Sequence, residues 1–194
     1  MADGNQRYRF AVTSPSAKVL PQVNPSVPMV DVPVQLILAS IKGAAQGRFA
    51  PEWTLSSQDR TGTALEHQFA LNELSFGVDN SLDQASGAPR RKMFEPVALL
   101  KATGGTTPQF YRALASNEKL TTAIFDCYGQ DKSGKLVLAA AVKLTEATVA
   151  SVTFDMLDMR KHEHAAEPIR DRISLVFQQV EVTFASKTFL DSWS

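Results

Sequence analysis

The sequence predicts a mainly β protein: a compact β-barrel, or two packed antiparallel sheets, with one flanking α-helix at about residues 107–116. Short segments with alternating apolar and polar residues recur along the chain, which is typical of strands that face a core on one side. Only one stretch shows clear helical spacing, and the apolar stripe of a lone short helix must be buried against a large apolar surface. A sheet or barrel of about six to eight strands provides that surface.

Charge balance and hydropathy exclude two classes of partner, nucleic acids and membranes. Lys and Arg number 20 and Asp and Glu also number 20, so the net charge is zero with neutral histidines. This balance lacks the basic footprint of a nucleic-acid binder, and no apolar run approaches the length of a transmembrane helix. We therefore expect no nucleic-acid partner and no membrane insertion, and little repulsion against self-association.

The N-terminal region predicts an arm followed by one domain. Four prolines between residues 15 and 28 prevent a long helix or a central strand there. We expect residues 1–31 to form an extended Pro-rich arm, either lying on the domain or loose as a tail, and residues 32–194 to form the domain. The polar N-terminus lacks the apolar core of a signal peptide, so we expect synthesis in the cytoplasm.

The first half of the domain is expected to hold three strands joined by long connections. Pro96 lies within the third strand and removes a donor, so we expect an edge, a bulge or a bend there. The predicted elements are a strand at 32–41, a turn at Lys42–Gly43, an inserted loop at 47–63, a strand at 65–78, a projecting connection at 79–90 that is not a tight hairpin, and a strand at 92–101.

The predicted helix follows, with a complete set of local signals. Thr107 is expected to be its N-cap, and Pro108 then falls at the first helical position. Phe110, Ala113 and Leu114 form its apolar stripe. Asn117 is expected to adopt the left-handed conformation that ends many helices.

The second half is expected to be rich in strands. The glycine-flanked segment 129–134 predicts a hairpin loop, and a break near Thr145–Glu146 predicts a corner. Cys127 is the single cysteine, which rules out an internal disulfide. It lies in an apolar strand pattern and is interpreted as a core residue. The predicted elements are strands at 120–128, 136–144 and 147–154, a charged loop at 156–168 and a last strand at 173–184.

A search for catalytic and metal-binding groups predicts none. His162 and His164 would point to one side of an extended chain, but no third ligand is evident and the basic residues Arg160 and Lys161 would repel a cation. We interpret this cluster as a solvated loop, with a metal-dependent enzyme as a lesser hypothesis. No nucleophile elbow or phosphate loop is present. We therefore predict no catalytic residue, no metal and no cofactor.

Several segments, in order, resemble the Hcp family, the tube component of bacterial type VI secretion systems. The resemblance covers roughly Val32 to the C-terminus, and the long arm and the 47–63 segment depart from the family pattern. The matching segments are 73–78, 92–97, Thr106-Thr107-Pro108 with 110–115, 142–149, 173–177 with 180–184, and Asp191-Ser192-Trp193.

The resemblance implies a structural protein that forms hexameric rings, which stack into a tube inside a sheath and carry effectors in the lumen. It implies sheath, spike and effector proteins as partners, and secretion from the bacterial cytoplasm through the apparatus without a cleavable signal peptide. The alternative is a monomeric β-module that binds a carbohydrate or peptide through Trp53 and Trp193. The expected stacking loop comprises Asn80, Ser81, Asp83, Gln84, Ser86 and Arg90, and the expected lumen- or protomer-facing helix surface comprises Gln109, Arg112 and Ser116.

Overall fold

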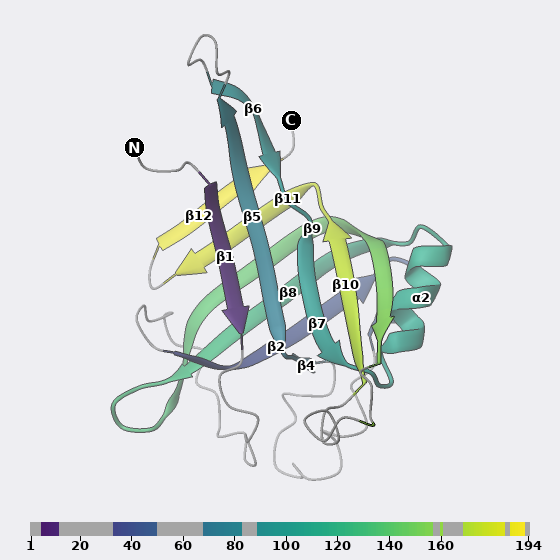
Figure 1. Cartoon of the computed structure of the whole chain (residues 1–194), viewed down its shortest axis with the longest axis horizontal. Helices are drawn as coiled ribbons and strands as arrows, with labels where there is room; N and C mark the ends of the chain where they lie inside the picture. Colours follow the sequence, from purple (N-terminus) through teal and green to yellow (C-terminus); the bar gives the residue numbers. More distant parts are fainter. Residues whose placement is uncertain are drawn as a thin grey trace.

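A computed structural model shows a mainly β protein with one α-helix on its flank, as predicted (Figure 1). It describes residues 5–11, 33–49, 68–82, 89–156, 160, 169–184 and 187–192. The strands form one 12-stranded antiparallel sheet that curls into two packed layers. Among the described strands the hydrogen-bonded path runs from β1 to β3 without closing, so the barrel is open.

Strand β9 joins the two layers. In Figure 1, β1, β5, β7 and β10 lie in one layer, while β2, β8, β11 and β12 lie in the other. β9 pairs with β8 and β11 in the second layer and then with β10 in the first. The order along the main path is β1-β5-β7-β10-β9-β8-β2-β3.

The N-terminal strands confirm one prediction and correct another. The predicted first strand is present as β2, but the predicted strand at 65–78 is two strands separated by a bend at Asn72. Within the predicted arm, β1 pairs antiparallel with β5, with Arg7 opposite Gly77. The bounds are β1 (Asn5–Ala11), β2 (Val34–Gly43), β3 (Gly47–Arg48), β4 (Phe69–Leu71) and β5 (Glu73–Leu82).

The connection predicted at 79–90 is strand at both ends, at residues 79–82 and 89–90. β5 continues to Leu82, and β6 (Pro89–Phe94) begins directly opposite it, with Leu82 paired to Pro89. The expected connection is therefore shortened to residues 83–88, which lie outside the described residues, because the ladder of β5 continues past the alternating residues that were visible in the sequence. Figure 1 shows this β5–β6 hairpin projecting beyond the rest of the sheet. The predicted bend at Pro96 is confirmed, since it separates β6 from β7 (Val97–Ala102).

The helix α2 (Thr107–Ala115) has the predicted place and buried stripe, but not the predicted cap. Phe110 and Ala113 are fully buried, and Asn117 has the predicted left-handed backbone with φ of 50°. The N-cap is Thr106 instead of Thr107, and it makes no side-chain capping hydrogen bond. The Thr107 hydroxyl oxygen instead accepts from the Gly104 amide and from Lys101, and the hydroxyl donates to a buried carboxylate.

The predicted corner in the long C-terminal hairpin is a change of partner without a break. β8 (Lys119–Gln130) is followed by β9 (Leu136–Asp155), a single strand of 20 residues. Glu146 has φ of 51°, and around it β9 changes partner: Thr145 pairs with Gln179 of β11, while Thr148 pairs with Val176 of β10.

The predicted last strand at 173–184 is wrong in two respects. It is divided into β10 (Arg170–Val176) and β11 (Gln179–Phe184), and a further strand follows, β12 (Lys187–Ser192). The division has a signal in the sequence, because the buried positions change from odd to even between Phe177 and Val180. One extended strand cannot place both sets on the same face.

The core fills the space between the two layers. Its largest fully buried side chains come from both layers and from α2, and Cys127 lies among them as predicted. A second apolar cluster occupies the other face of β2 and the β8–β9 hairpin: Leu36, Leu38, Tyr128 and Leu136. The fully buried large residues of the core include Phe49, Phe69, Phe110, Phe125, Ile37, Ile41, Leu71, Leu74, Leu99, Leu120 and Leu144.

Candidate assembly interface

A buried polar network fixes the start of α2 to the sheet. Lys101 of β7 and Asp171 of β10 face each other in the ladder, and their side chains form an ion pair of 3.3 Å with no exposed surface. The Thr107 and Thr103 hydroxyls donate to the two oxygens of Asp171, and the Gly104 amide donates to Thr107 at 3.0 Å. The network satisfies both charges, as burial requires.

A second polar contact fixes the end of α2 to the turn after β2. The Glu118 carboxylate accepts hydrogen bonds from the Ala45 and Gln46 amides, each at 2.8 Å, and from the Gln46 side chain at 2.7 Å. The side-chain amide of Gln46 also donates to the Gln109 carbonyl of α2 at 3.1 Å. Burial would raise the pKa of Glu118, but these hydrogen bonds and the nearby Arg112 charge hold that pKa below its ordinary value.

The predicted helix surface forms a continuous strip on α2. Arg112 and Ser116 are exposed, Gln109 is half-buried, and the Ser116 hydroxyl donates to the Arg112 carbonyl at 2.9 Å. Tyr111 adds an aromatic ring, 41% exposed, next to this strip. Because both ends of α2 are tied to the sheet, the strip has a fixed orientation relative to the strands.

The predicted stacking residues are divided between strands and loop. Asn80 and Ser81 lie in β5, and Arg90 lies in β6. Asp83, Gln84 and Ser86 fall outside the described residues. The part that the structure describes therefore places three of the six residues on the projecting β5–β6 hairpin.

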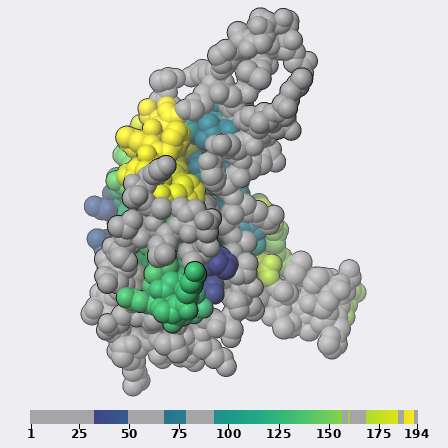
Figure 2. All heavy atoms as spheres, turned by 90° about the vertical axis from the view of Figure 1, so that its left-hand side faces the viewer, coloured from purple at the N-terminus to yellow at the C-terminus, as the bar shows by residue number. Residues whose placement is uncertain are grey.

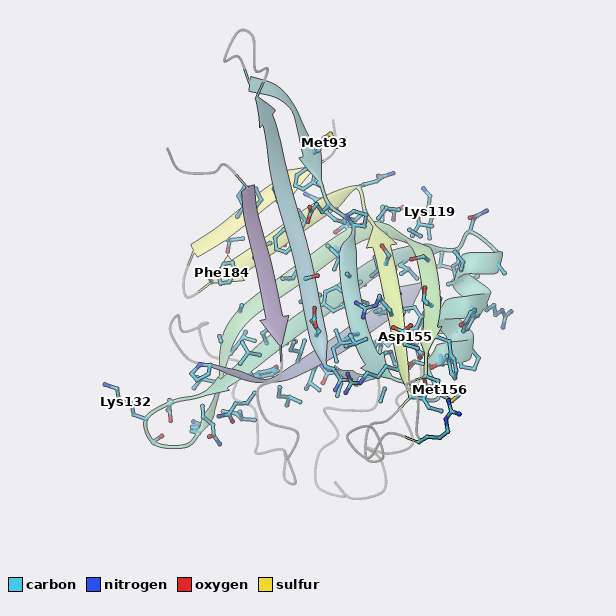
Figure 3. The ribbon with its side chains drawn as sticks, viewed as in Figure 1. Met93, Lys119, Lys132, Asp155, Met156 and Phe184 are labelled. Atoms are coloured by element: carbon cyan, nitrogen blue, oxygen red, sulfur yellow. The ribbon has the colours of Figure 1, made fainter. Side chains whose placement is uncertain are left out.

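The tip of the β8–β9 hairpin is a second, rigid projection. Asp131 accepts hydrogen bonds from the Ser133 amide and hydroxyl and from the Lys135 amide, at 2.6–3.0 Å. These bonds hold the pKa of Asp131 below its ordinary value. Figure 3 shows Lys132 at the end of this hairpin, away from α2. The sequence predicted the loop but gave no reason to assign it a role.

Two groups of exposed apolar side chains were missed in the sequence. The β9–β10 patch consists of Phe154, Met156 and Ile169, which are 47%, 64% and 38% exposed. The β12 patch consists of Phe189 and Leu190, which are 44% and 59% exposed. Alternation of apolar and polar residues cannot distinguish these side chains from core residues, because it does not show where along a strand the opposite layer of the sheet ends.

The remaining predicted groups yield no chemistry in the described part of the chain. The histidine cluster at 162–164, Trp53 and Trp193 all fall outside it. Among the described residues, no group of three His, Cys, Asp or Glu side chains could hold a metal ion. Burial, together with the Asp126 charge, raises the pKa of Cys127 to about 12. No described helix is long and apolar enough to cross a membrane.

Comparison with protein families decides the relationship. Residues 57–184 match the family described as "Type VI secretion system effector, Hcp". The chain belongs to the Hcp family. It is therefore a tube protein of a type VI secretion system, and family membership does not favour the monomeric binding module. A comparison with curated proteins found no match.

Solved Hcp structures share the fold at low sequence identity. A crystal structure of an Hcp protein is 20% identical, with a TM-score of 0.74 over 82% of this chain and 98% of that chain. Hcp1 from Escherichia coli EAEC 042 is 17% identical, with a TM-score of 0.66 over 82% and 99%. Hcp3 from Pseudomonas aeruginosa is 17% identical, with a TM-score of 0.60 over 81% and 99%.

Proposed function

We propose that this Hcp protein assembles into hexameric rings that stack into a secreted tube and carry effector proteins in the lumen. The family match over residues 57–184 carries the proposal. A closed ring of identical subunits needs two different, complementary faces on each protomer. The chain is a structural subunit in this proposal, with sheath, spike and effector proteins as partners, and it leaves the bacterial cytoplasm through the apparatus.

The outer face of α2 is assigned to the lumen or to a neighbouring protomer. Gln109, Arg112 and Ser116 form the strip that would make this contact. This assignment is supported by the polar contacts at the two ends of α2, which hold the strip in one orientation. A preorganised surface loses little conformational entropy when a partner binds.

Stacking of rings is assigned to the β5–β6 hairpin. The residues assigned to this contact are Asn80, Ser81, Asp83, Gln84, Ser86 and Arg90. The support is the projection of this hairpin beyond the rest of the sheet (Figure 1). A projecting element can reach the next ring without disturbing the contacts within its own ring.

The N-terminal residues 1–31 are assigned to an arm on the domain of residues 32–194. The pairing of β1 with β5 supports an arm that lies on the domain over residues 5–11. In a ring, a strand added at this edge of the sheet would also restrict which segments of a neighbour can pair there.

Electron microscopy and sedimentation of the purified chain test the proposal. We expect rings at high protein concentration, and stacked rings when the concentration is raised further. A particle that remains monomeric under all these conditions would contradict ring assembly.

Replacing residues 83–88 with a short Gly-Ser linker separates the two levels of assembly. We expect single rings to persist and stacks to disappear. The matched control is Lys132→Ser at the other projection, which should leave stacks intact. Normal stacking of the linker variant would remove the β5–β6 hairpin from the stacking contact.

A further inference from the structure

We propose that residues 12–31 of the N-terminal arm dock on the outer face of β2 and β8, within their own chain. This inference extends the assignment of residues 1–31 to an arm, and it does not depend on ring assembly. The docking face is the second apolar cluster, formed by Leu36, Leu38, Tyr128 and Leu136.

The second apolar cluster lies on the side of the sheet that points away from the core. Ile37 and Ile41 of β2 belong to the main core, so the alternate residues Leu36 and Leu38 point outward. Leu36 pairs with Tyr128 of the neighbouring strand β8. The cluster is therefore an apolar surface on the outer side of the second layer.

These outward side chains are nevertheless buried: Leu38 is 2% exposed, and Leu36 and Tyr128 are each 7% exposed. The described elements in main contact with β2 are its ladder neighbours β3, β4 and β8 and the strand β1 of the opposite layer. In Figure 1 the first layer covers the core face of the second layer, and α2 lies at the flank. Because an open face of an antiparallel sheet stays in contact with water, the cover of this face has to come from outside the described elements.

A carboxylate on the same face gives a second indication of cover. Asp126 pairs with Leu38 in the ladder, so the two side chains share the outer face. Burial raises the pKa of Asp126 above its ordinary value. A carboxylate on an open face would be hydrated, so the cover extends from β2 onto β8.

The change in burial along β2 locates the cover. On the outer face Leu36 and Leu38 are buried, Ser40 is half-buried and Lys42 is exposed. The buried end is the start of β2, which follows the arm directly, and Figure 2 shows this start, in purple, beside the β8–β9 hairpin, in green. The exposed end pairs with β3, after which residues 50–67 begin. The arm is therefore the segment nearer to the cluster.

The composition of residues 12–31 suits an apolar face. They include two charged residues, whereas residues 50–67 include four. Their four prolines favour an extended conformation, and extended Pro-rich segments dock on apolar surfaces that carry an aromatic ring, such as that of Tyr128. The larger apolar residues of the segment include Val19, Leu20, Val23, Val27, Met29 and Val30.

Both ends of the segment are attached close to the face. β1 ends at Ala11 and contacts β2, and β2 itself begins at Val34. A segment of this length spans up to roughly 65 Å when extended, which is enough to cross the cluster and return. Attachment at both ends also gives the arm a high effective concentration at this face, which favours it over a second copy of the chain.

Thiol labelling at position 38 tests the docking. Leu38→Cys places a thiol in the cluster, while the native Cys127 is fully buried. A maleimide reagent should label the dilute variant slowly, and replacement of residues 13–30 by a Gly-Ser linker of equal length should raise the rate at least about tenfold. The matched control is Lys42→Cys, at the exposed end of the same face, which should react fast with either arm.

The outcomes separate failure of this docking from failure of the proposed function. Fast labelling of Leu38→Cys with the natural arm would overturn the docking, because the face would then be open. Slow labelling that persists with the Gly-Ser arm would overturn it in favour of another occupant. That occupant is residues 50–67 if their replacement releases the thiol, or a second copy if labelling slows as the protein concentration rises. Ring assembly of the wild-type chain is observed separately by electron microscopy, so either proposal can fail alone.

Point variants in the arm provide a measurement that keeps its length and prolines. In the Leu38→Cys background, Leu20→Asp/Val23→Asp puts two charges on the docking segment, and burial of unpaired charge is unfavourable. We expect labelling at least about tenfold faster than with the natural arm. The matched control is Ser16→Asp/Ser26→Asp, which adds the same charge at polar positions and should leave labelling slow. Equal labelling rates for the two arm variants would overturn apolar docking, and circular dichroism checks that each variant is folded.

Discussion

Lys101 and Asp171 form an ion pair whose Nζ and Oδ2 atoms lie 3.3 Å apart, with both side chains completely buried. The pair joins β7 to β10, and through the Thr107 hydroxyl it also fixes the first turn of α2. An ion pair of this kind stabilises little compared with apolar residues of similar size, but removal of one partner leaves an unpaired buried charge. This asymmetry gives the first prediction.

Asp171→Ala should lower the free energy of unfolding by about 3–5 kcal/mol, because Lys101 then lacks its counter-charge. Urea unfolding followed by circular dichroism measures this loss. The double variant Lys101→Met/Asp171→Leu removes both charges and should recover most of the stability. If the single and double variants are equally unstable, the unpaired charge is not the cause.

Stability should depend on Glu118 at acid pH. The folded-state pKa of Glu118 is lowered from 4.5, so the folded protein favours the charged carboxylate. Its contribution to stability is therefore complete above about pH 5 and is lost as the pH falls through the folded pKa. Unfolding free energies of wild type and Glu118→Gln, measured across this range, should differ most at neutral pH and converge in acid. A difference that grows as the pH falls would contradict the assignment.

Gly43→Ala should be destabilising for a specific steric reason. A Cβ atom at this position would lie 2.1 Å from Oε1 of Glu118, so the carboxylate must move and lose its hydrogen bonds to the turn. We expect a loss of roughly 1–3 kcal/mol. In a Glu118→Ala background the same substitution should cost almost nothing further, as a double-mutant cycle would measure. If Gly43→Ala lowers the free energy of unfolding equally in both backgrounds, Glu118 is not the group with which the new Cβ atom collides.

Cys127 should resist alkylation in the native protein. Its side chain is fully buried, and burial raises the pKa of the thiol to about 12, so at pH 8 only about one thiol in ten thousand is ionised. Mass spectrometry after treatment with iodoacetamide should detect modification only in urea. Lys132→Cys, on an exposed hairpin tip, is the matched control and should react at once. Fast labelling of native Cys127 would contradict the core assignment.

Local patterns were sufficient for much of the fold. Phe110 and Ala113 are spaced for one helical face, and both are buried. Pro96 cannot donate to a ladder, and the chain leaves its strand there. Two of the failures have a common cause, which is that the backbone changes direction where the sequence has no proline or glycine. They are the bend at Asn72 and the division between β10 and β11.

The candidate surfaces were predicted less completely than the fold. Arg112 and Ser116 are exposed, as a helix periodicity argument requires. The exposure of Met156 and Leu190 was not predicted, because it depends on where the opposite layer of the sheet ends. Likewise, the hydroxyl of Thr107 looked like a cap, but a carboxylate 64 residues away accepts its hydrogen bond.

The sequence by itself determined that the chain is a β protein with one flanking helix, that it follows the Hcp pattern, and that Cys127 belongs to the core. Alternation, helical spacing and proline act over a few neighbouring residues, so they can be recognised without knowing the fold. Only the tertiary structure decided the pairing of Lys101 with Asp171, which are 70 residues apart, the open path of the sheet and the two exposed apolar patches. These features depend on which strands become neighbours, and the free energy that selects those neighbours comes from packing of the whole core.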